Sequence, residues 1–178
     1  MKLVIEENSL TFMFLLENDV TGDIMSPKVI KDGFRRQNER HITILGGSTS
    51  ELLKNILNKL TKEDKKSILD KIKNFIEDLE WKFESKEIYL ISKNGCIDNS
   101  SISEERQSYI NMVEMPDMQV FYKKLSNLLE ANLPVQVPHI TLFTKGERKN
   151  PVWYGIPIPS KEEFHNLRPQ KICNYLRI

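Results

Sequence analysis

Cysteine is scarce in this sequence, and no excess of one charge is present. The 178 residues include only two cysteines, Cys96 and Cys173, which lie far apart and lack the spacing of metal ligands. They argue against a disulfide scaffold and favour a reducing compartment. Twenty-six Lys and Arg against 25 Asp and Glu leave a formal net charge of +1. This balance argues against a protein that coats nucleic acid non-specifically, so a polyanion would have to meet a local cluster.

Long hydrophobic runs are also missing. The chain turns acidic at Glu6 and Glu7 after an apolar stretch too short for a signal peptide, and no run approaches transmembrane length. Hydrophobic residues make up 39% and charged residues 29% of the chain, which is typical of a soluble globular protein. We therefore expect a cytoplasmic protein with no membrane partner, folded over residues 1–178 as one domain or as two small lobes that share a core.

Hydrophobic periodicity predicts strands and helices in a mixed order. Short β-prone apolar runs predict strands, and apolar residues at helical spacing predict helices. Ser48 with Glu51 forms a capping box, and Thr61 with Asp64 resembles a second helix start. The expected elements are strands over 10–16, 40–45, 87–92, 107–114 and 139–143, with helices from 48, 61 and 117 and a short helix near 162. This order predicts an α+β protein whose halves each contribute one histidine strand.

Three local features complete the structural prediction. Residues 93–95 (Lys-Asn-Gly) and 99–101 (Asn-Ser-Ser) have the composition of turns between the two central strands. Val120 belongs to the predicted buried face of the helix that starts at residue 117. The stretch between residues 22 and 33 contains two glycines and a proline and is expected to form an irregular loop.

Histidine is rare, yet two of the three histidines begin nearly identical tetrads. Residues 41–44 read His-Ile-Thr-Ile, and residues 139–142 read His-Ile-Thr-Leu. A second histidine would repeat the Ile-Thr-aliphatic sequel by chance in roughly one case in a thousand. Side chains alternate between the faces of a strand, so each His and its Thr share one face, with about 6.6 Å between them along the backbone. A phosphate between them can touch both side chains.

Two such strands around one groove would supply the groups that phosphodiester cleavage needs. Imidazole suits both proton-transfer roles because its unperturbed pKa is about 6.5. One neutral histidine can take a proton from water while the other, protonated, donates to the departing oxygen, which predicts a bell-shaped pH dependence around neutrality. The hydroxyls of Thr43 and Thr141 can hold the non-bridging oxygens.

A metal is not required by this chemistry, and the pattern is poor evidence for one. His41 and His139 are 98 positions apart, and neither tetrad contains a carboxylate. Zinc sites draw their ligands from closer and richer clusters. We expect no metal and no cofactor.

Paired His-x-Thr-x motifs resemble the signature of the 2H phosphoesterase superfamily. The resemblance implies an α+β, bilobal fold with two antiparallel sheets around a central cleft and with flanking helices. It implies that His41 acts as general acid and His139 as general base. It also implies that the substrate is an RNA 3′ end with a 2′,3′-cyclic phosphate, a cyclic nucleotide or a short oligonucleotide. Hydrolysis of 2′,3′-cyclic ends to 2′-phosphates is the first choice, because it is the commonest outcome among relatives.

Several residues near the tetrads are candidates for substrate binding, and all except Lys145 have a structural alternative. Lys145 directly follows the second tetrad and can contact phosphate. Arg36 either meets the phosphate or sugar edge or is a surface charge, and Tyr109 either points into the groove or belongs to the core. Trp153 and Tyr154 either stack on a base or close the C-terminal core.

Two functions fit the sequence. The first is a metal-independent phosphodiesterase that uses the two histidines and two threonines. The second is a catalytically silent module that holds a nucleotide phosphate with the same groups, as a sensor or sponge. Retention of two titratable histidines favours the enzyme, since binding alone needs only Arg or Lys.

Overall fold

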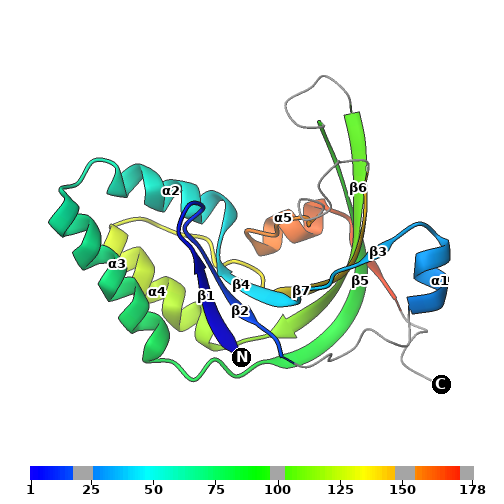
Figure 1. The fold of residues 1–178 in the computed structure, drawn as a ribbon, viewed down its shortest axis with the longest axis horizontal. Coiled ribbons are helices and arrows are strands. Elements are labelled where there is room, and N and C mark those ends of the chain that lie inside the picture. Colours follow the sequence, from blue (N-terminus) through cyan, green and yellow to red (C-terminus); the bar gives the residue numbers. More distant parts are fainter. Residues whose placement is uncertain (18–25, 97–102, 147–154, 173–178) are drawn as a thin grey trace.

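A computed structural model describes residues 1–17, 26–96, 103–146 and 155–172 of this protein (Figure 1). Within these ranges the chain forms eight strands and five helices. The strands are β1 (Lys2–Glu6), β2 (Thr11–Leu15), β3 (Arg35–Arg36), β4 (His41–Leu45), β5 (Glu84–Cys96), β6 (Ser103–Glu114), β7 (His139–Lys145) and β8 (Gln170–Lys171). The helices are α1 (Ser26–Lys31), α2 (Gly47–Leu57), α3 (Lys62–Glu77), α4 (Asp117–Leu129) and α5 (Lys161–Asn166).

The strands belong to one antiparallel sheet, so the expectation of two separate sheets in a bilobal fold is corrected. Its order is β1-β2-β4-β7-β6-β5-β8, and β3 pairs with β7 beside β4. The mixed α+β class is confirmed. The single sheet arises because the two histidine strands, β4 and β7, are themselves neighbours and share the bridge Ile42↔Ile140. Each half of the chain contributes one of these two strands.

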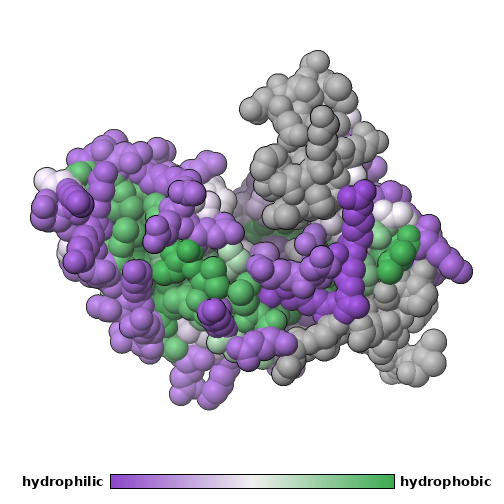
Figure 2. Space-filling view, in the orientation of Figure 1, coloured by the Kyte–Doolittle hydropathy of each residue, from purple (hydrophilic) through white to green (hydrophobic). Residues whose placement is uncertain are grey.

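The main core lies between one face of the sheet and helices α2, α3 and α4, which lie together in Figure 1. Ile42 and Ile44 of β4 are fully buried there, as strand alternation requires. They pack in one cluster with Leu53 of α2, Ile72 of α3 and Phe121 of α4. Figure 2 shows apolar side chains reaching the surface around β1 and along these helices. Half-buried members of the cluster include Leu3, Ile5, Ile56, Ile68 and Phe75.

A smaller core covers the opposite face of β5 and β6. Ile91 and Ile110 are buried here against Ile156 and Ile158, which come from the extended segment before α5. In the register of β6 with β7, Ile110 is the partner of Thr141. Cross-strand partners point to the same face, so the smaller core and the Thr141 side chain share that face. This places α5 and residues 155–159 beside the second tetrad.

The seam between β4 and β7 is the least regular part of the sheet. β3 pairs with β7 through Arg36↔Phe143, and β4 pairs with it through Ile42↔Ile140. Residues 36 and 42 are six positions apart, but their partners on β7, residues 143 and 140, are only three positions apart. Three extra residues therefore leave the ladder between β3 and β4. This bow lies directly before the first histidine.

Helix starts follow the sequence in one case and depart from it in another. Thr61 is the N-cap of α3 as expected, and its hydroxyl accepts a hydrogen bond from the Asp64 N–H. The capping box predicted at Ser48 is wrong, because Gly46 is the N-cap of α2 and no side chain caps that helix. Gly47 then adopts a positive φ of 54°, which glycine tolerates best.

Other local expectations are corrected by the long hairpin of β5 and β6. Residues 93–95 continue β5 and pair with β6, so they are strand and not turn. Residues 99–101 lie outside the described residues. Val120 is 45% exposed because the buried face of α4 runs through Met118, Phe121 and Leu125 instead. Helix α1 occupies part of the stretch expected to be a loop. Among the described residues, no helix is long and apolar enough to cross a membrane.

Candidate functional site

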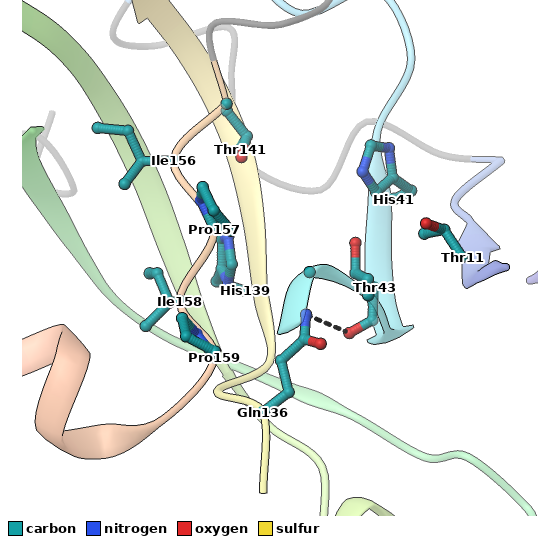
Figure 3. Close-up of a pocket in the computed structure, with 13 residues that line it drawn as sticks. Thr11, His41, Thr43, Gln136, His139, Thr141, Ile156, Pro157, Ile158 and Pro159 are labelled. Carbon is teal, nitrogen blue, oxygen red and sulfur yellow. Dashed lines mark hydrogen bonds between the residues drawn. The ribbon is translucent and has the colours of Figure 1, made fainter. Parts of the chain in front are cut away.

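The four polar residues of the tetrads line one pocket. His41 and Thr43 come from β4, and His139 and Thr141 come from β7 (Figure 3). All four are half-buried, while the aliphatic residues between them are buried in the main core. The pocket has a volume of about 200 Å³. Strand alternation therefore sorts each tetrad into a core side and a pocket side, as the sequence predicts.

The register of the two strands interleaves the tetrads. The bridge joins Ile42 to Ile140 in an antiparallel pair. One residue to either side of that bridge, His41 faces Thr141 and Thr43 faces His139 across the seam. Each imidazole thus has a hydroxyl from the other strand as its neighbour, in addition to the hydroxyl two residues further along its own strand. Two imidazoles and two hydroxyls therefore surround the pocket.

His139 is held in a fixed tautomer. Its Nδ1–H donates a hydrogen bond of 2.9 Å to the backbone carbonyl of Val137. Because Nδ1 carries the proton, Nε2 of the neutral ring has a free lone pair. Burial lowers the pKa of His139, the Val137 carbonyl opposes that effect, and the charge of protonated His41 lowers the pKa further. This coupling requires the two rings to be close. Neutral His139 is set up to accept a proton.

His41 has the same sequence context and a different environment. Burial lowers its pKa, but the carboxylates of Glu39 and Glu6 oppose this by stabilising the imidazolium. Its Nδ1 is buried and has no hydrogen-bond partner among the described residues. His139 has no carboxylate among the causes of its shift. Of the two rings, His41 is therefore the better site for a positive charge.

The N-terminus of α2 opens on the same pocket. Gly46 and Gly47 both line it, and the helix has no side-chain cap. The first N–H groups of a helix lack intrahelical partners and, with the helix dipole, favour an anion. Gly46 also approaches Thr43 closely, since a Cβ at residue 46 would lie 2.8 Å from Thr43 Cγ2. Glycine at this position leaves room for the hydroxyl-bearing side chain.

Other pocket residues were not identified from the sequence. Gln136 is 6% exposed, and its amide donates to the Thr43 carbonyl at 3.4 Å, which links the loop before β7 to β4. Thr11 of β2 lines the pocket beside Thr43. The opposite wall is the segment 155–159, anchored by buried Ile156 and Ile158. The alternation Ile-Pro-Ile-Pro over 156–159 was the one sequence signal for this wall.

Lys145 and Tyr109 do not reach the pocket, because a β-bulge reverses the alternation of β7. Ile110 pairs with Thr141 and Tyr109 pairs with Phe143, so residue 142 is an extra residue in the ladder. Beyond the bulge, Lys145 points to the face opposite Thr141. Its Nζ donates to the Asp32 carbonyl at 2.9 Å and lies 5.5 Å from the Phe34 ring centroid. Tyr109 packs edge-on against the same ring, in the main core.

The remaining sequence candidates lie elsewhere or outside the described residues. Arg36 is exposed on β3 and does not line the pocket. Trp153 and Tyr154 lie outside the described residues, so the two alternatives for them stay open. His165 is exposed on α5, away from the pocket lining. In the described ranges, no group of three or more His, Cys, Asp or Glu side chains is arranged to hold a metal ion.

No protein-family model, curated protein or solved structure matches this chain. The observations that bear on function are therefore the two tetrads and the pocket that they form.

Proposed function

We propose that this protein is a metal-independent phosphodiesterase of the 2H phosphoesterase kind, which opens the cyclic phosphate of a 2′,3′-cyclic nucleotide or RNA 3′ end. One observation carries the proposal: two His-x-Thr tetrads, 98 positions apart in sequence, line the same pocket from adjacent strands. In this proposal the two halves of the sheet correspond to the two lobes of the family fold, and each supplies one histidine strand.

His139 acts as the general base. Its Nε2 has a free lone pair because Nδ1–H is bound to the Val137 carbonyl. A water molecule loses its proton to Nε2 as its oxygen attacks phosphorus. Burial keeps the ring neutral at neutral pH because it lowers the pKa. The carbonyl of Val137 also stabilises the imidazolium as it forms, which is the role of a fixed orienting group.

His41 acts as the general acid. The bond from phosphorus to the sugar oxygen breaks, and the oxygen takes a proton from the His41 imidazolium. Glu39 and Glu6 favour that imidazolium in the free protein, and the negative phosphate favours it further when substrate is bound. After the reaction the proton gained by His139 and the proton lost by His41 are exchanged with solvent, so the enzyme is unchanged.

The non-bridging oxygens are held by neutral donors. The hydroxyls of Thr43 and Thr141 flank the phosphate, and the uncapped N-terminus of α2 faces it from the end of β4. Donors that are already oriented before the reaction stabilise the charge that develops in the transition state. No Lys or Arg lines the pocket within the described residues.

The test is turnover of 2′,3′-cyclic nucleotides in EDTA. The parent protein is compared with His41→Ala and His139→Ala, and with His165→Ala as a matched control from the surface of α5. We expect the parent and His165→Ala to accumulate nucleoside 2′-phosphate, and the other two variants to lose at least about 100-fold in kcat/KM.

Two outcomes contradict the proposal. Equal turnover by all four proteins would show that the histidines are not the catalytic groups. Binding of the nucleotide by the parent without turnover would instead support the silent binding module that uses the same four side chains.

A further inference from the structure

A second compartment adjoins the pocket on the far side of His41. It has a volume of about 100 Å³ and is lined by Gln37, Glu39, His41, Thr141 and Gly155. His41, Thr141 and Gly155 also line the pocket between the tetrads, so the two spaces meet at the general acid. We call this space the Glu39 compartment. It exists because the chain bows away from β7 between β3 and β4, where three extra residues leave the ladder.

The residues between β3 and β4 supply the Glu39 compartment with hydrogen-bond acceptors. The Gln37 amide nitrogen donates to Thr144 Oγ1 at 3.0 Å, which leaves its carbonyl oxygen to accept. The Glu39 carboxylate is exposed to solvent and accepts only. Neither Lys nor Arg is among the described residues that line this space. A group with a hydroxyl or amino donor fits the acceptors of Gln37 and Glu39, and the Glu39 charge disfavours an anion placed beside it.

The pocket and the Glu39 compartment together form one continuous space, and its two ends favour different chemical groups. The N-terminus of α2 lies past Thr43 and favours negative charge. Glu39 and Gln37 lie on the other side of His41 and favour a neutral donor. Along the chain from residue 39 to residue 47, the order is the Glu39 carboxylate, the general acid His41, the hydroxyl of Thr43 and the N-terminus of α2. A substrate can satisfy both ends in only one orientation.

We infer that the Glu39 compartment binds the 5′-hydroxyl arm of a nucleoside 2′,3′-cyclic monophosphate, so that mononucleotides with a free 5′-hydroxyl are preferred to RNA ends. This inference depends on the proposed function. If water attacks phosphorus and the bond to O3′ breaks, the product is the 2′-phosphate and O3′ takes its proton from His41. The sugar carbon next to C3′ is C4′, which carries the 5′ arm, while the base is attached on the C2′ side. Protonation of O3′ by His41 thus directs the 5′ arm toward Gln37 and Glu39.

The charge of Glu39 then decides between substrate classes. A 5′-hydroxyl donates to the carboxylate or to the Gln37 carbonyl. A 5′-phosphate, or the phosphodiester of a longer RNA, brings a second negative charge beside the carboxylate. Like charges a few ångströms apart near a protein surface repel by an amount that corresponds to about a ten-fold change in affinity or more.

The experiment compares three substrates: adenosine 2′,3′-cyclic phosphate with a 5′-hydroxyl, with a 5′-phosphate and with a 5′-deoxy carbon. For the parent we expect kcat/KM to be about ten-fold higher for the 5′-hydroxyl compound than for either other substrate. Glu39→Gln removes the charge and should reduce the discrimination against the 5′-phosphate to within about three-fold. Glu39→Lys should invert it. Because Glu39 is exposed, both variants are expected to fold, and their melting curves check this.

Glu6→Gln is the matched control. Glu6 also stabilises protonated His41, but it does not line the Glu39 compartment. We expect this variant to keep the parent's preference among the three substrates. Equal kcat/KM of the parent for the 5′-hydroxyl and 5′-phosphate compounds overturns the inference and leaves the phosphodiesterase intact. A parent that turns over none of the three overturns the proposed function and this inference with it.

Discussion

The two tetrads have nearly the same sequence and lie in unlike surroundings. On β7, His139 is anchored through Nδ1 to a backbone carbonyl, and burial and the neighbouring His41 lower its pKa. On β4, His41 has a buried Nδ1 without a partner among the described residues, and two carboxylates oppose the effect of burial. The same imidazole is therefore better at accepting a proton on one strand and better at carrying one on the other.

In the proposed mechanism, this difference divides the roles of acid and base between the two copies of the motif. Acid–base catalysis needs one neutral and one protonated group at the same pH, and two identical sites cannot supply both efficiently. The asymmetry comes from residues outside the tetrads. Val137 precedes β7 by two positions, and Glu39 precedes β4 by two positions. We call the tetrad residues of each strand, with their neighbours, a half-site. Substitutions in one half-site at a time therefore test how the two differ.

The largest expected effects come from removing each histidine and changing the leaving group. With a cyclic nucleotide, His41→Ala and His139→Ala should each lower kcat by about 10²–10⁴-fold. In a nucleoside phosphodiester that carries a 4-nitrophenyl group, the 4-nitrophenolate anion can leave without taking a proton. With that substrate, we expect His41→Ala to recover most of its activity, because the acid is no longer needed, and His139→Ala to stay defective.

The leaving-group comparison also has a clear contrary result. Recovery of His139→Ala instead of His41→Ala would exchange the two roles, and it would mean that Glu39 and Glu6 do not decide which ring carries the proton. Recovery of neither variant would mean that protonation of the leaving oxygen is not what either histidine contributes.

The next largest expected effect is the loss of kcat when the hydroxyl of Thr43 or Thr141 is removed. Thr43→Val and Thr141→Val keep the shape of each side chain and remove one donor to the developing negative charge. Loss of one such donor typically lowers kcat by about 10²–10³-fold, and we expect this at both positions. Thr43→Ser and Thr141→Ser should restore most of the rate. Valine variants with unchanged kcat would show that the hydroxyls do not touch the phosphate.

Gly46→Ala should affect the β4 half-site alone. The added Cβ would lie 2.8 Å from Thr43 Cγ2, while the extended backbone at residue 46 accepts alanine without strain. Displacement of Thr43 by part of an ångström should lower kcat about ten-fold with little loss of stability. Gly95→Ala is the control, since its Cβ makes an ordinary contact at 3.7 Å with the Arg106 side chain. Similar kcat values for the two variants would show that the space at residue 46 does not matter.

The sequence was sufficient for the elements that depend on local pattern. The strands that became β2, β4 and β7 have β-prone apolar runs, and the start of α3 has a capping threonine, so each was predicted near its observed position. The four tetrad residues follow from strand alternation alone. These features depend on neighbours in the chain, which a sequence displays directly.

What failed depended on distant partners. Lys145 was expected at the phosphate by alternation from Thr141, but a bulge formed by pairing with β6 reversed its face. Gln136 and Glu39 belong to no motif, and only the seam of the sheet brings Gln136 to the pocket and Glu39 to the adjoining compartment. The single sheet itself follows from one bridge between strands nearly a hundred residues apart, which no local pattern encodes.

The smallest expected effect is a shift in the pH dependence of kcat/KM, and it distinguishes the pKa of His41 from that of His139. Burial lowers both pKa values from 6.5, so the bell-shaped profile of kcat/KM should have its maximum below pH 6.5, more acidic than the sequence alone suggests. The charged groups that raise the pKa of His41 against the effect of burial are Glu39 and Glu6. Glu39→Gln and, to a smaller extent, Glu6→Gln should lower the pKa of His41, because each removes a charge that stabilises the imidazolium.

The sign of this shift identifies the limb that His41 controls. The acid must be protonated, so activity is lost as pH rises through its pKa, and the alkaline limb should move to lower pH in both variants. The acidic limb, set by His139, should stay in place. Both carboxylates are exposed, and about 1 M salt should therefore erase most of the difference from the parent. Movement of the acidic limb instead would show that His41 has the lower pKa of the two rings, which contradicts its assignment as the ring that carries the proton.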